Sequence, residues 1–339
     1  MKIKKPTQLD VAQLAGVSRA TVSYIINDNA VTNIPQETQQ RVWDAVKTLG
    51  YVPNQQAQHL RKRSTNRICV VFSRLGVPYN DRFIEDFQHV ARSYGYSIIV
   101  SICNTFEDIE YLLTQLKGGL ADGLFLEIVD ARPETTQHIV ELFDSFYLPK
   151  IVMGQVDPEE ISADVFRSEP LAASYSAVQH LIEKGHEHIA FLGHYIPERD
   201  EYDRFNGYRN ALHDAGISVD ESLISDGANS RKTAYQSAEK LLNLDTPPTA
   251  IFCTADVAAL SVIAAAHYRG MHVPDDLAVI GTGNIPECEY SFPKLTSIGP
   301  LNRDISHVAE RLISLVKEGN NSSPTTIIQE WDLILRDST

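Results

Sequence analysis

The chain has 339 residues, of which 43% are apolar, and a formal net charge of −14. This length and composition exclude a disordered chain and a single small domain, because they provide for a sizeable core and for two or three domains. No uncharged apolar run reaches the about 18 residues of a membrane helix, and the N-terminal MKIKKPTQ lacks the apolar core of a signal peptide. We therefore expect a cytoplasmic protein without a membrane partner.

The net charge hides a strong asymmetry along the chain. Residues 1–67 carry ten Lys/Arg and four Asp/Glu, a net charge of +6. The whole chain carries 30 Lys/Arg and 44 Asp/Glu, so residues 68–339 carry 20 Lys/Arg and 40 Asp/Glu, a net charge of −20. A basic segment on an acidic body is typical of a DNA-binding head, since only the head has to meet phosphates. A solvated basic tail is the alternative, but here the basic residues alternate with an ordered apolar pattern.

Residues 9–27, LDVAQLAGVSRATVSYIIN, predict two short helices joined by a tight turn. Gly16 can end the first helix in the left-handed conformation, and the Ser18 hydroxyl can cap the second. In this helix-turn-helix pattern the second helix presents Arg19, Ala20 and Ser23 to base edges in a major groove. A helical hairpin with no ligand is the alternative reading. The apolar positions at helical spacing are Val11, Leu14, Ala15, Val17, Val22, Ile25 and Ile26.

A third helix is predicted at 35–49, with a proline at its start and Gly50 at its end. Its expected apolar face is Val42, Trp43, Val46 and Leu49. The following polar segment 51–63 is too short to form a stable free helix, because isolated helices of fewer than about 12–15 residues are marginal in water. We interpret it as a hinge that folds on a partner.

The stretches DVAQLAGVSRATVSYIIN, LGYVPN and AQHL resemble the lactose/galactose repressor (LacI/GalR) family of bacterial transcription regulators. The resemblance implies that the hinge helices of a homodimer pair in the minor groove of a pseudo-palindromic operator. Leu60 would wedge between base pairs, with Ala57 facing the DNA and the partner helix. Without the resemblance, Leu60 would be read as an ordinary linker contact. The expected DNA-contacting residues are Thr7, Ser18, Arg19, Ala20, Thr21, Ser23, Tyr24, Asn27, Thr38, Tyr51, Asn54, Ala57, Gln58 and Leu60.

From residue 67 onward, short apolar strands alternate with amphipathic helices, which predicts an α/β body of doubly wound parallel sheets. The body is longer than one sheet usually spans, so two lobes are expected. The resemblance implies a periplasmic-binding-protein-like fold with three chain crossings, near Ala163, Ser297 and Pro324. The expected strands are 67–72, 97–102, 123–128, 149–153, 188–192, 250–253 and 277–281, and the helices 81–95, 106–118, 170–184, 203–215, 234–244 and 256–269.

The predicted domains follow from these boundaries. They are a helix-turn-helix head at 1–50, a hinge and linker at 51–66, an N-terminal lobe of 67–162 with 298–323, and a C-terminal lobe of 163–297 with 324–339.

Effector-binding residues are expected where strands end, because ligands bind at the carboxyl edge of parallel sheets. The resemblance assigns effector contacts to Arg204 and Asp256 in one lobe and to Phe83 in the other. Their alternatives are a surface ion pair for Arg204, a helix cap for Asp256 and core packing for Phe83. The expected effector-binding residues are Arg74, Asn80, Phe83, Asn104, Arg204, Asp256 and Asn284.

Departures from the family pattern leave the effector class open. Residues 225–228 lack the aromatic residue that stacks on the effector in many members, and 282–284 read Thr-Gly-Asn in place of an aromatic–acid–acid run. A sugar is the expected effector by family resemblance, with nucleobases, sugar phosphates and other polar metabolites as alternatives. Tyr24 also replaces a basic or polar residue, so the operator sequence does not carry over.

The sequence predicts no catalytic residues, cofactor or metal. Residues 281–286 lack the third glycine of a dinucleotide site, and His186-Glu187-His188 has no partner at metal-ligand spacing. The cysteines are far apart without a C-x-x-C pair, so Cys69, Cys103, Cys253 and Cys288 are expected to be buried free thiols. The predicted function is a ligand-responsive repressor, and the alternative is a cytoplasmic sugar sensor acting through protein contacts.

Overall fold

The structure of the protein is a computed structural model that describes residues 6–26, 34–52, 64–128, 133–144, 147–154, 156–193, 204–228, 230–302, 304–319 and 323–339. The contacts divide the chain into two compact units, Met1–Thr65 and Asn66–Thr339. We call them the head and the body and describe each by itself.

The head consists of three helices, α1 (Gln8–Ala15), α2 (Arg19–Ile26) and α3 (Gln36–Leu49). Helix α1 starts in a capping box, in which Thr7 and Asp10 satisfy each other's backbone N–H groups. Gly16 ends the helix with φ +67°, a conformation that favours glycine. These local signals produce the turn that the sequence predicts.

The core of the head differs from the expected one at two positions. Leu14 and Trp43 are 53% and 47% exposed, although their spacing placed both on apolar faces. Ala45 and Tyr51 are buried in their place. The inward face of α3 therefore starts at Val42 and continues one turn later at Ala45, which turns the neighbouring Trp43 toward solvent.

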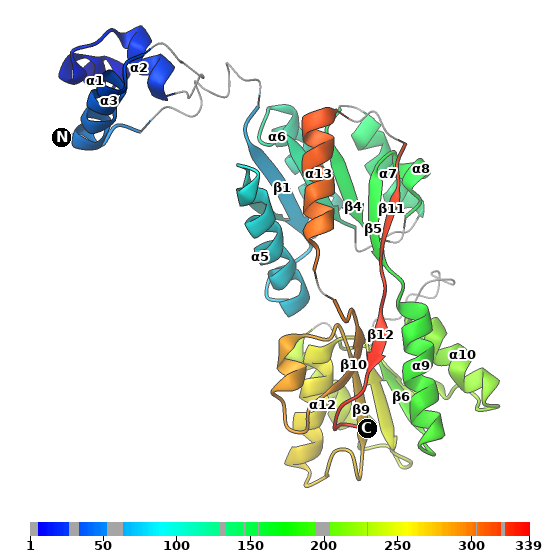
Figure 1. Ribbon diagram of the computed structural model, residues 1–339. Helices are drawn as coiled ribbons and strands as arrows, with labels where there is room; N and C mark the ends of the chain where they lie inside the picture. The colour runs from blue at the N-terminus through cyan, green and yellow to red at the C-terminus, as the bar shows by residue number, and fades with distance from the viewer. Residues whose placement is uncertain are drawn as a thin grey trace. The chain divides into compact units, whose positions relative to one another are not determined.

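The body contains two sheets of six strands, each belonging to one lobe (Figure 1). The sheet of the N-terminal lobe has the order β11-β5-β4-β3-β1-β2, and all its strand pairs are parallel. Helices α5 and α13 cover one face, and α6, α7 and α8 the other. The strands are β1 (Arg67–Phe72), β2 (Ser97–Ile102), β3 (Gly123–Glu127), β4 (Lys150–Met153), β5 (Asp164–Ser168) and β11 (Thr326–Gln329). The helices are α5 (Pro78–Ser93), α6 (Phe106–Lys117), α7 (Pro133–Asp144), α8 (Pro158–Ile161) and α13 (Ser306–Glu318).

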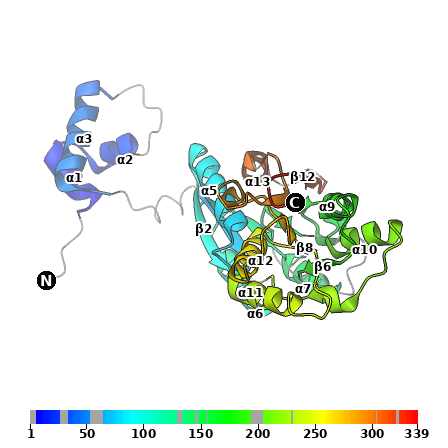
Figure 2. The ribbon, with the colours of Figure 1, turned by 90° about the horizontal axis from the view of Figure 1, so that it is seen from below.

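The sheet of the C-terminal lobe has the order β12-β10-β9-β8-β6-β7, with only β12 antiparallel to its neighbour. Figure 2 shows α9 and α10 on one side of its strands and α11 and α12 on the other. The strands are β6 (Ile189–Leu192), β7 (Ile224–Ser225), β8 (Ala250–Cys253), β9 (Ala278–Thr282), β10 (Thr296–Gly299) and β12 (Asp332–Ile334). The helices are α9 (Pro170–Glu183), α10 (Arg204–Asp214), α11 (Arg231–Leu241) and α12 (Asp256–Tyr268), with short 3-10 turns at Glu221–Leu223 and Pro286–Glu289.

The chain passes between the lobes three times, but later than the sequence-based boundaries. Ala163 and Pro324 each precede a further strand, because β5 and β11 pair with each other in the N-terminal sheet. Ser297 lies inside β10, so the second crossing follows Gly299. These strands are short, and each belongs to the lobe whose strands it pairs with. The sequence does not reveal these pairing partners.

The expected architecture is confirmed: a helical head and two α/β lobes with predominantly parallel sheets. All four cysteines are buried free thiols, as predicted. Among the helices that the structure describes, none has both the length and the apolar character needed to cross a bilayer.

A close approach of α9 and α10 yields a prediction for stability. A Cβ atom on Gly207 would lie 2.6 Å from both the Leu171 carbonyl oxygen and the Ser174 Cβ. We expect Gly207→Ala to lower the free energy of unfolding of the body by about 1–3 kcal/mol through overpacking, although alanine is the better helix former. Urea unfolding measures this change. Asn210→Ala, on the exposed side of the same helix, is the matched control, and an equally stable Gly207→Ala variant would contradict the packing account.

Candidate functional site

The outer side of α2 is the candidate recognition surface of the head. The Ser18 hydroxyl accepts a hydrogen bond from the Thr21 backbone N–H at 3.1 Å and so caps the helix. Arg19, Ala20 and Tyr24 are exposed, and Ser23 is half-buried. The predicted N-terminal residues of this helix therefore lie together on one accessible face, as direct readout in a major groove requires.

Two other predicted DNA contacts, Thr7 and Tyr51, have structural roles in the head, and a third, Thr38, is half-buried. The Thr7 side chain caps α1, and Thr38, in the first turn of α3, is half-buried. Tyr51 is only 8% exposed, and burial raises the pKa of its hydroxyl. Its ring therefore belongs to the core, which its position after the predicted third helix did not reveal. Asn27, Asn54, Ala57, Gln58 and Leu60 lie outside the described residues.

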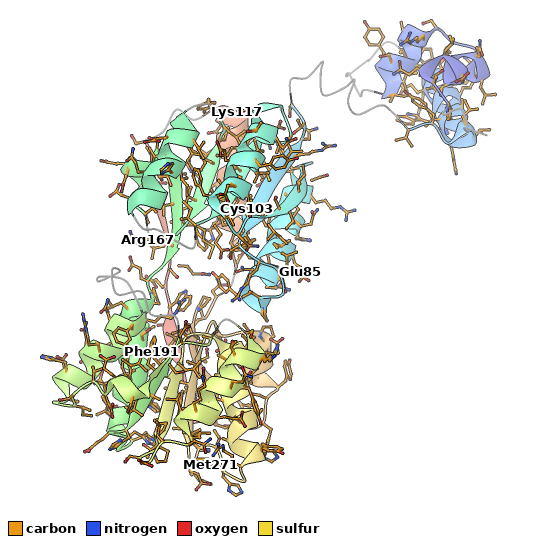
Figure 3. The ribbon with its side chains drawn as sticks, turned by 180° about the vertical axis from the view of Figure 1, so that it is seen from behind. Glu85, Cys103, Lys117, Arg167, Phe191 and Met271 are labelled. Carbon is orange, nitrogen blue, oxygen red and sulfur yellow. The ribbon has the colours of Figure 1, made fainter. Side chains whose placement is uncertain are left out.

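In the N-terminal lobe, polar residues gather at the carboxyl edge of the sheet. Arg74 is exposed two residues past β1, next to Ser73, whose backbone N–H donates to the Glu127 carboxylate at 2.7 Å. Asn104 follows β2, is exposed, and donates its backbone N–H to Asp108 at 3.0 Å. Arg167, near the end of β5, lies toward the end of this lobe that leads to the other lobe (Figure 3). The sheet thus brings Arg74, Asn104 and Arg167 to one edge.

Phe83 belongs to the core of this lobe. Its ring centroid lies 4.6 Å from that of Phe125 and 5.5 Å from that of Phe72. Asn80, one turn earlier in α5, is also buried. A cavity of about 20 Å³ touches Phe83, which is room for one water molecule and not for a sugar. In this structure Phe83 supports the site through packing, and its contact with an effector stays a prediction.

In the C-terminal lobe, Asp256 opens α12 and is 1% exposed. Its carboxylate accepts hydrogen bonds from the Ser297 hydroxyl at 2.6 Å and from the Ile285 backbone N–H at 2.8 Å. A side chain on Gly281 would overlap this carboxylate, so the glycine is needed for the close approach. Burial first and the charge of Asp256 second raise the pKa of the Cys253 thiol. Asp256 therefore ties α12 to β10 and to the segment that follows β9.

Asn284 extends this network toward the second crossing. Its side-chain amide donates to the Pro300 carbonyl at 3.0 Å and accepts from the Arg336 guanidinium at 2.8 Å. Arg336 also pairs with Glu289 at 2.7 Å, and the hydrogen bond lowers the pKa of that carboxyl. Sequence reasoning missed the roles of Ser297 and Arg336, because both are fixed by contacts between distant segments.

Arg204 opens α10 and packs against an aromatic residue that the sequence analysis did not select. Its guanidinium carbon lies 5.1 Å from the ring centroid of Trp331, in the third crossing. Arg204 and Asp256 lie at the same edge of the sheet, but their helices cover opposite faces. Trp331 could have been noticed as one of only two tryptophans in the chain.

The segment after β7, where the family's stacking aromatic is missing, borders a pocket of about 250 Å³. Among the described residues, its lining is polar and contains no aromatic ring: Asp226, Gly227, Thr233, Gln236, Ser237 and Lys240. The hydroxyls of Thr233 and Ser237 donate to the carbonyl oxygens of Gly227 and Asp226. The sequence indicates that this segment lacks the stacking aromatic residue, and no described residue that lines the pocket supplies one from elsewhere in the chain.

In the part of the chain that the structure describes, no group of three His, Cys, Asp or Glu side chains is arranged to hold a metal ion. His186 of the predicted structural trio lies 2.9 Å from the Thr249 hydroxyl through Nδ1. The hydrogen bond joins the turn before β6 to the one before β8, which is a structural role.

Comparisons with known proteins agree with both units. A model described as bacterial regulatory proteins, lacI family, matches residues 7–54, and a periplasmic binding protein-like domain matches residues 178–339. The HTH-type transcriptional repressor PurR of Actinobacillus pleuropneumoniae serotype 3 (strain JL03) is 30% identical over 339 residues and 97% of each chain.

Solved structures show the same fold. The transcriptional regulator CelR, solved as a complex with cellobiose, is 26% identical in sequence to this chain. Its TM-score is 0.69 over 98% of this chain and all of that chain. The lac repressor dimer bound to operator and the anti-inducer ONPF is 23% identical, with a TM-score of 0.82 over 99% of both chains. At this identity the second match supports the fold alone.

The Asp256 network yields a prediction. Asp256→Asn weakens the bonds to Ser297 and Ile285, so we expect the free energy of unfolding without effector to fall by about 1–3 kcal/mol. Ser297→Ala removes one of the same bonds from the other end, and the two losses should be less than additive in the double variant. Denaturant unfolding of all three variants tests this. Full additivity, or an unchanged Asp256→Asn variant, would show that the carboxylate does not hold the strands.

Proposed function

Because the chain belongs to the LacI family of bacterial regulatory proteins, which are transcription regulators and not enzymes, we propose that it is a repressor with ligand-switched operator affinity. A small molecule bound between the two lobes of the body would shift the protein between DNA-competent and incompetent states. A location in the cytoplasm, with the nucleoid, belongs to the same proposal, because operators lie there.

The exposed face of α2 is the observation that carries this proposal. Arg19, Ala20 and Tyr24 point outward from a helix that Ser18 caps and a buried core holds. The head has a net positive charge, and the body has a net negative charge. Phosphate attraction therefore acts on the head, while base contacts from α2 supply sequence selection.

A sugar is the effector class that we propose from family resemblance. The likeness of the body to the CelR–cellobiose complex and the match to a periplasmic binding protein-like domain support it. The sheet edges offer donors and acceptors suited to hydroxyl groups, and a guanidinium suits paired oxygens. The proposed contacts are Arg74, Asn80, Phe83, Asn104, Arg204, Asp256 and Asn284.

We further propose that the protein acts as a homodimer on a pseudo-palindromic operator. Hinge contacts from Asn54, Ala57, Gln58 and Leu60 belong to this proposal. An exposed apolar row supports pairing of two bodies: Val100 and Ile102 project from one face of the edge strand β2 and are 38% and 46% exposed. Apolar side chains along an unpaired edge favour association with another chain.

Operator binding is tested with DNA upstream of the genes neighbouring its own. We expect binding that weakens steeply with salt, because phosphate contacts release counterions. Arg19→Ala should cost about 1–3 kcal/mol of operator affinity and relax selection at the contacted bases. Arg92→Ala, an exposed arginine of the body, removes the same charge and should bind as the parent protein does. If the protein shows no salt-dependent binding to this DNA, with or without candidate sugars, the proposed regulatory function is refuted.

The dimer surface is tested by a charge on β2. Val100→Glu buries a carboxylate in the proposed interface, so we expect a shift from dimer to monomer in light scattering and a loss of operator affinity of tenfold or more. Tyr111→Glu, on an exposed site of α6, serves as the control and should remain dimeric. A dimeric Val100→Glu protein would place the interface elsewhere.

A further inference from the structure

Trp331 occupies the third crossing, between the last strand of the N-terminal lobe and the last strand of the C-terminal lobe. Strand β12, which follows it, runs antiparallel to β10 and pairs Asp332 with Gly299. Trp331 therefore lies just beyond the carboxyl end of β10. In α/β sheets this is the edge at which ligands bind.

The ring of Trp331 is anchored on the protein side. It packs against the cluster formed by α9, α10 and their strands, which includes Phe191 and Tyr208. The guanidinium carbon of Arg204 lies 5.1 Å from its ring centroid, within the range of a cation–π contact. The guanidinium and the indole ring therefore lie together at the sheet edge.

The indole nitrogen of Trp331 finds no hydrogen-bond acceptor among the described residues. Its Nε1 atom is buried and has no hydrogen-bond partner in the part of the chain that the structure describes. Buried tryptophan N–H groups usually find a partner, and an unpaired one calls for an explanation. An acceptor supplied by a bound molecule would satisfy it.

The guanidinium and the indole N–H share one chemical property: both only donate hydrogen bonds. A carboxylate accepts bonds at both oxygens and donates none, and charge-assisted bonds to it are about twice as strong as neutral ones. A sugar hydroxyl brings a donor hydrogen as well, for which this pair has no acceptor.

We propose that Trp331 is an effector-binding residue, and that its indole N–H acts with the Arg204 guanidinium to bind the carboxylate of a sugar acid. The inference rests on the effector-regulated function proposed above and narrows its ligand class. In this proposal Trp331, in the third crossing, supplies the aromatic contact to the effector that the segment after β7 lacks. Since Trp331 lies between strands of the two lobes, a ligand bound to it would act directly on a lobe connection.

The test uses D-gluconate and D-glucuronate as probes, with D-glucose as the neutral match, on the full chain. Trp43→Phe leaves Trp331 as the single tryptophan. We expect one of the two acids to change its fluorescence, and D-glucose to bind at least tenfold more weakly. Trp331→Phe retains the ring but removes the donor, so the affinity for that acid by calorimetry should fall about tenfold or more. The melting temperature without ligand should stay the same.

Arg204→Lys is a second variant, which keeps the positive charge but loses the paired donors of the guanidinium. We expect the same loss of affinity for the sugar acid. Binding of neither acid, equal binding of D-glucose, or an unchanged affinity in Trp331→Phe would each overturn the proposal. Operator binding of the same proteins is also measured without any of the three probe sugars. This measurement tests the proposed regulatory function independently of the Trp331 proposal. A protein that binds operator DNA but neither acid remains a regulator, with an effector of another class.

Discussion

The hydrogen bonds of the buried Asp256 carboxylate are the interaction on which the carboxyl edge of the C-terminal sheet depends. A charge at 1% exposure is stable in an interior only if donors replace its lost water, and Ser297 and Ile285 supply them. Those donors belong to β10 and to the segment after β9, so one side chain sets helix α12 against two strands. Asn284 carries the network on to the second crossing. The carboxyl edge of this sheet and the second crossing thus share one hydrogen-bonded cluster.

The charge distribution explains why a strongly acidic protein can bind DNA. The net negative body repels phosphates over about the 10 Å of a Debye length at 0.1 M salt, which favours the approach of the head to a duplex over that of the body. Within the head, the buried core and the caps at Thr7 and Ser18 hold α2 in one conformation. Electrostatics then sets which part of the chain approaches the DNA, and the fixed helix sets which side chains reach the bases.

Local signals in the sequence predicted most of the body. The strands at 67–72, 97–102 and 250–253 have the expected bounds, because continuous β-branched and apolar runs leave little choice. Contacts between distant segments decided the rest. The lobe of β5 follows from its pairing with β11, and the core places of Phe83 and Tyr51 from residues far along the chain or on another helix. The places of the candidate site residues at strand ends could be predicted, whereas the partners of Asn284 and Arg204 could not.

The pairing of β11 and β12 with opposite sheets has a consequence for synthesis. Both strands lie within the last 14 residues, 326–339, and each is the edge strand of its lobe. While the chain emerges from the ribosome, β5 and β10 each present an unpaired edge until residues 326–334 have been synthesised, and exposed edges invite pairing with other chains. Neither sheet is complete before residues 326–334 have been synthesised, so removal of this one segment would leave both lobes without an edge strand.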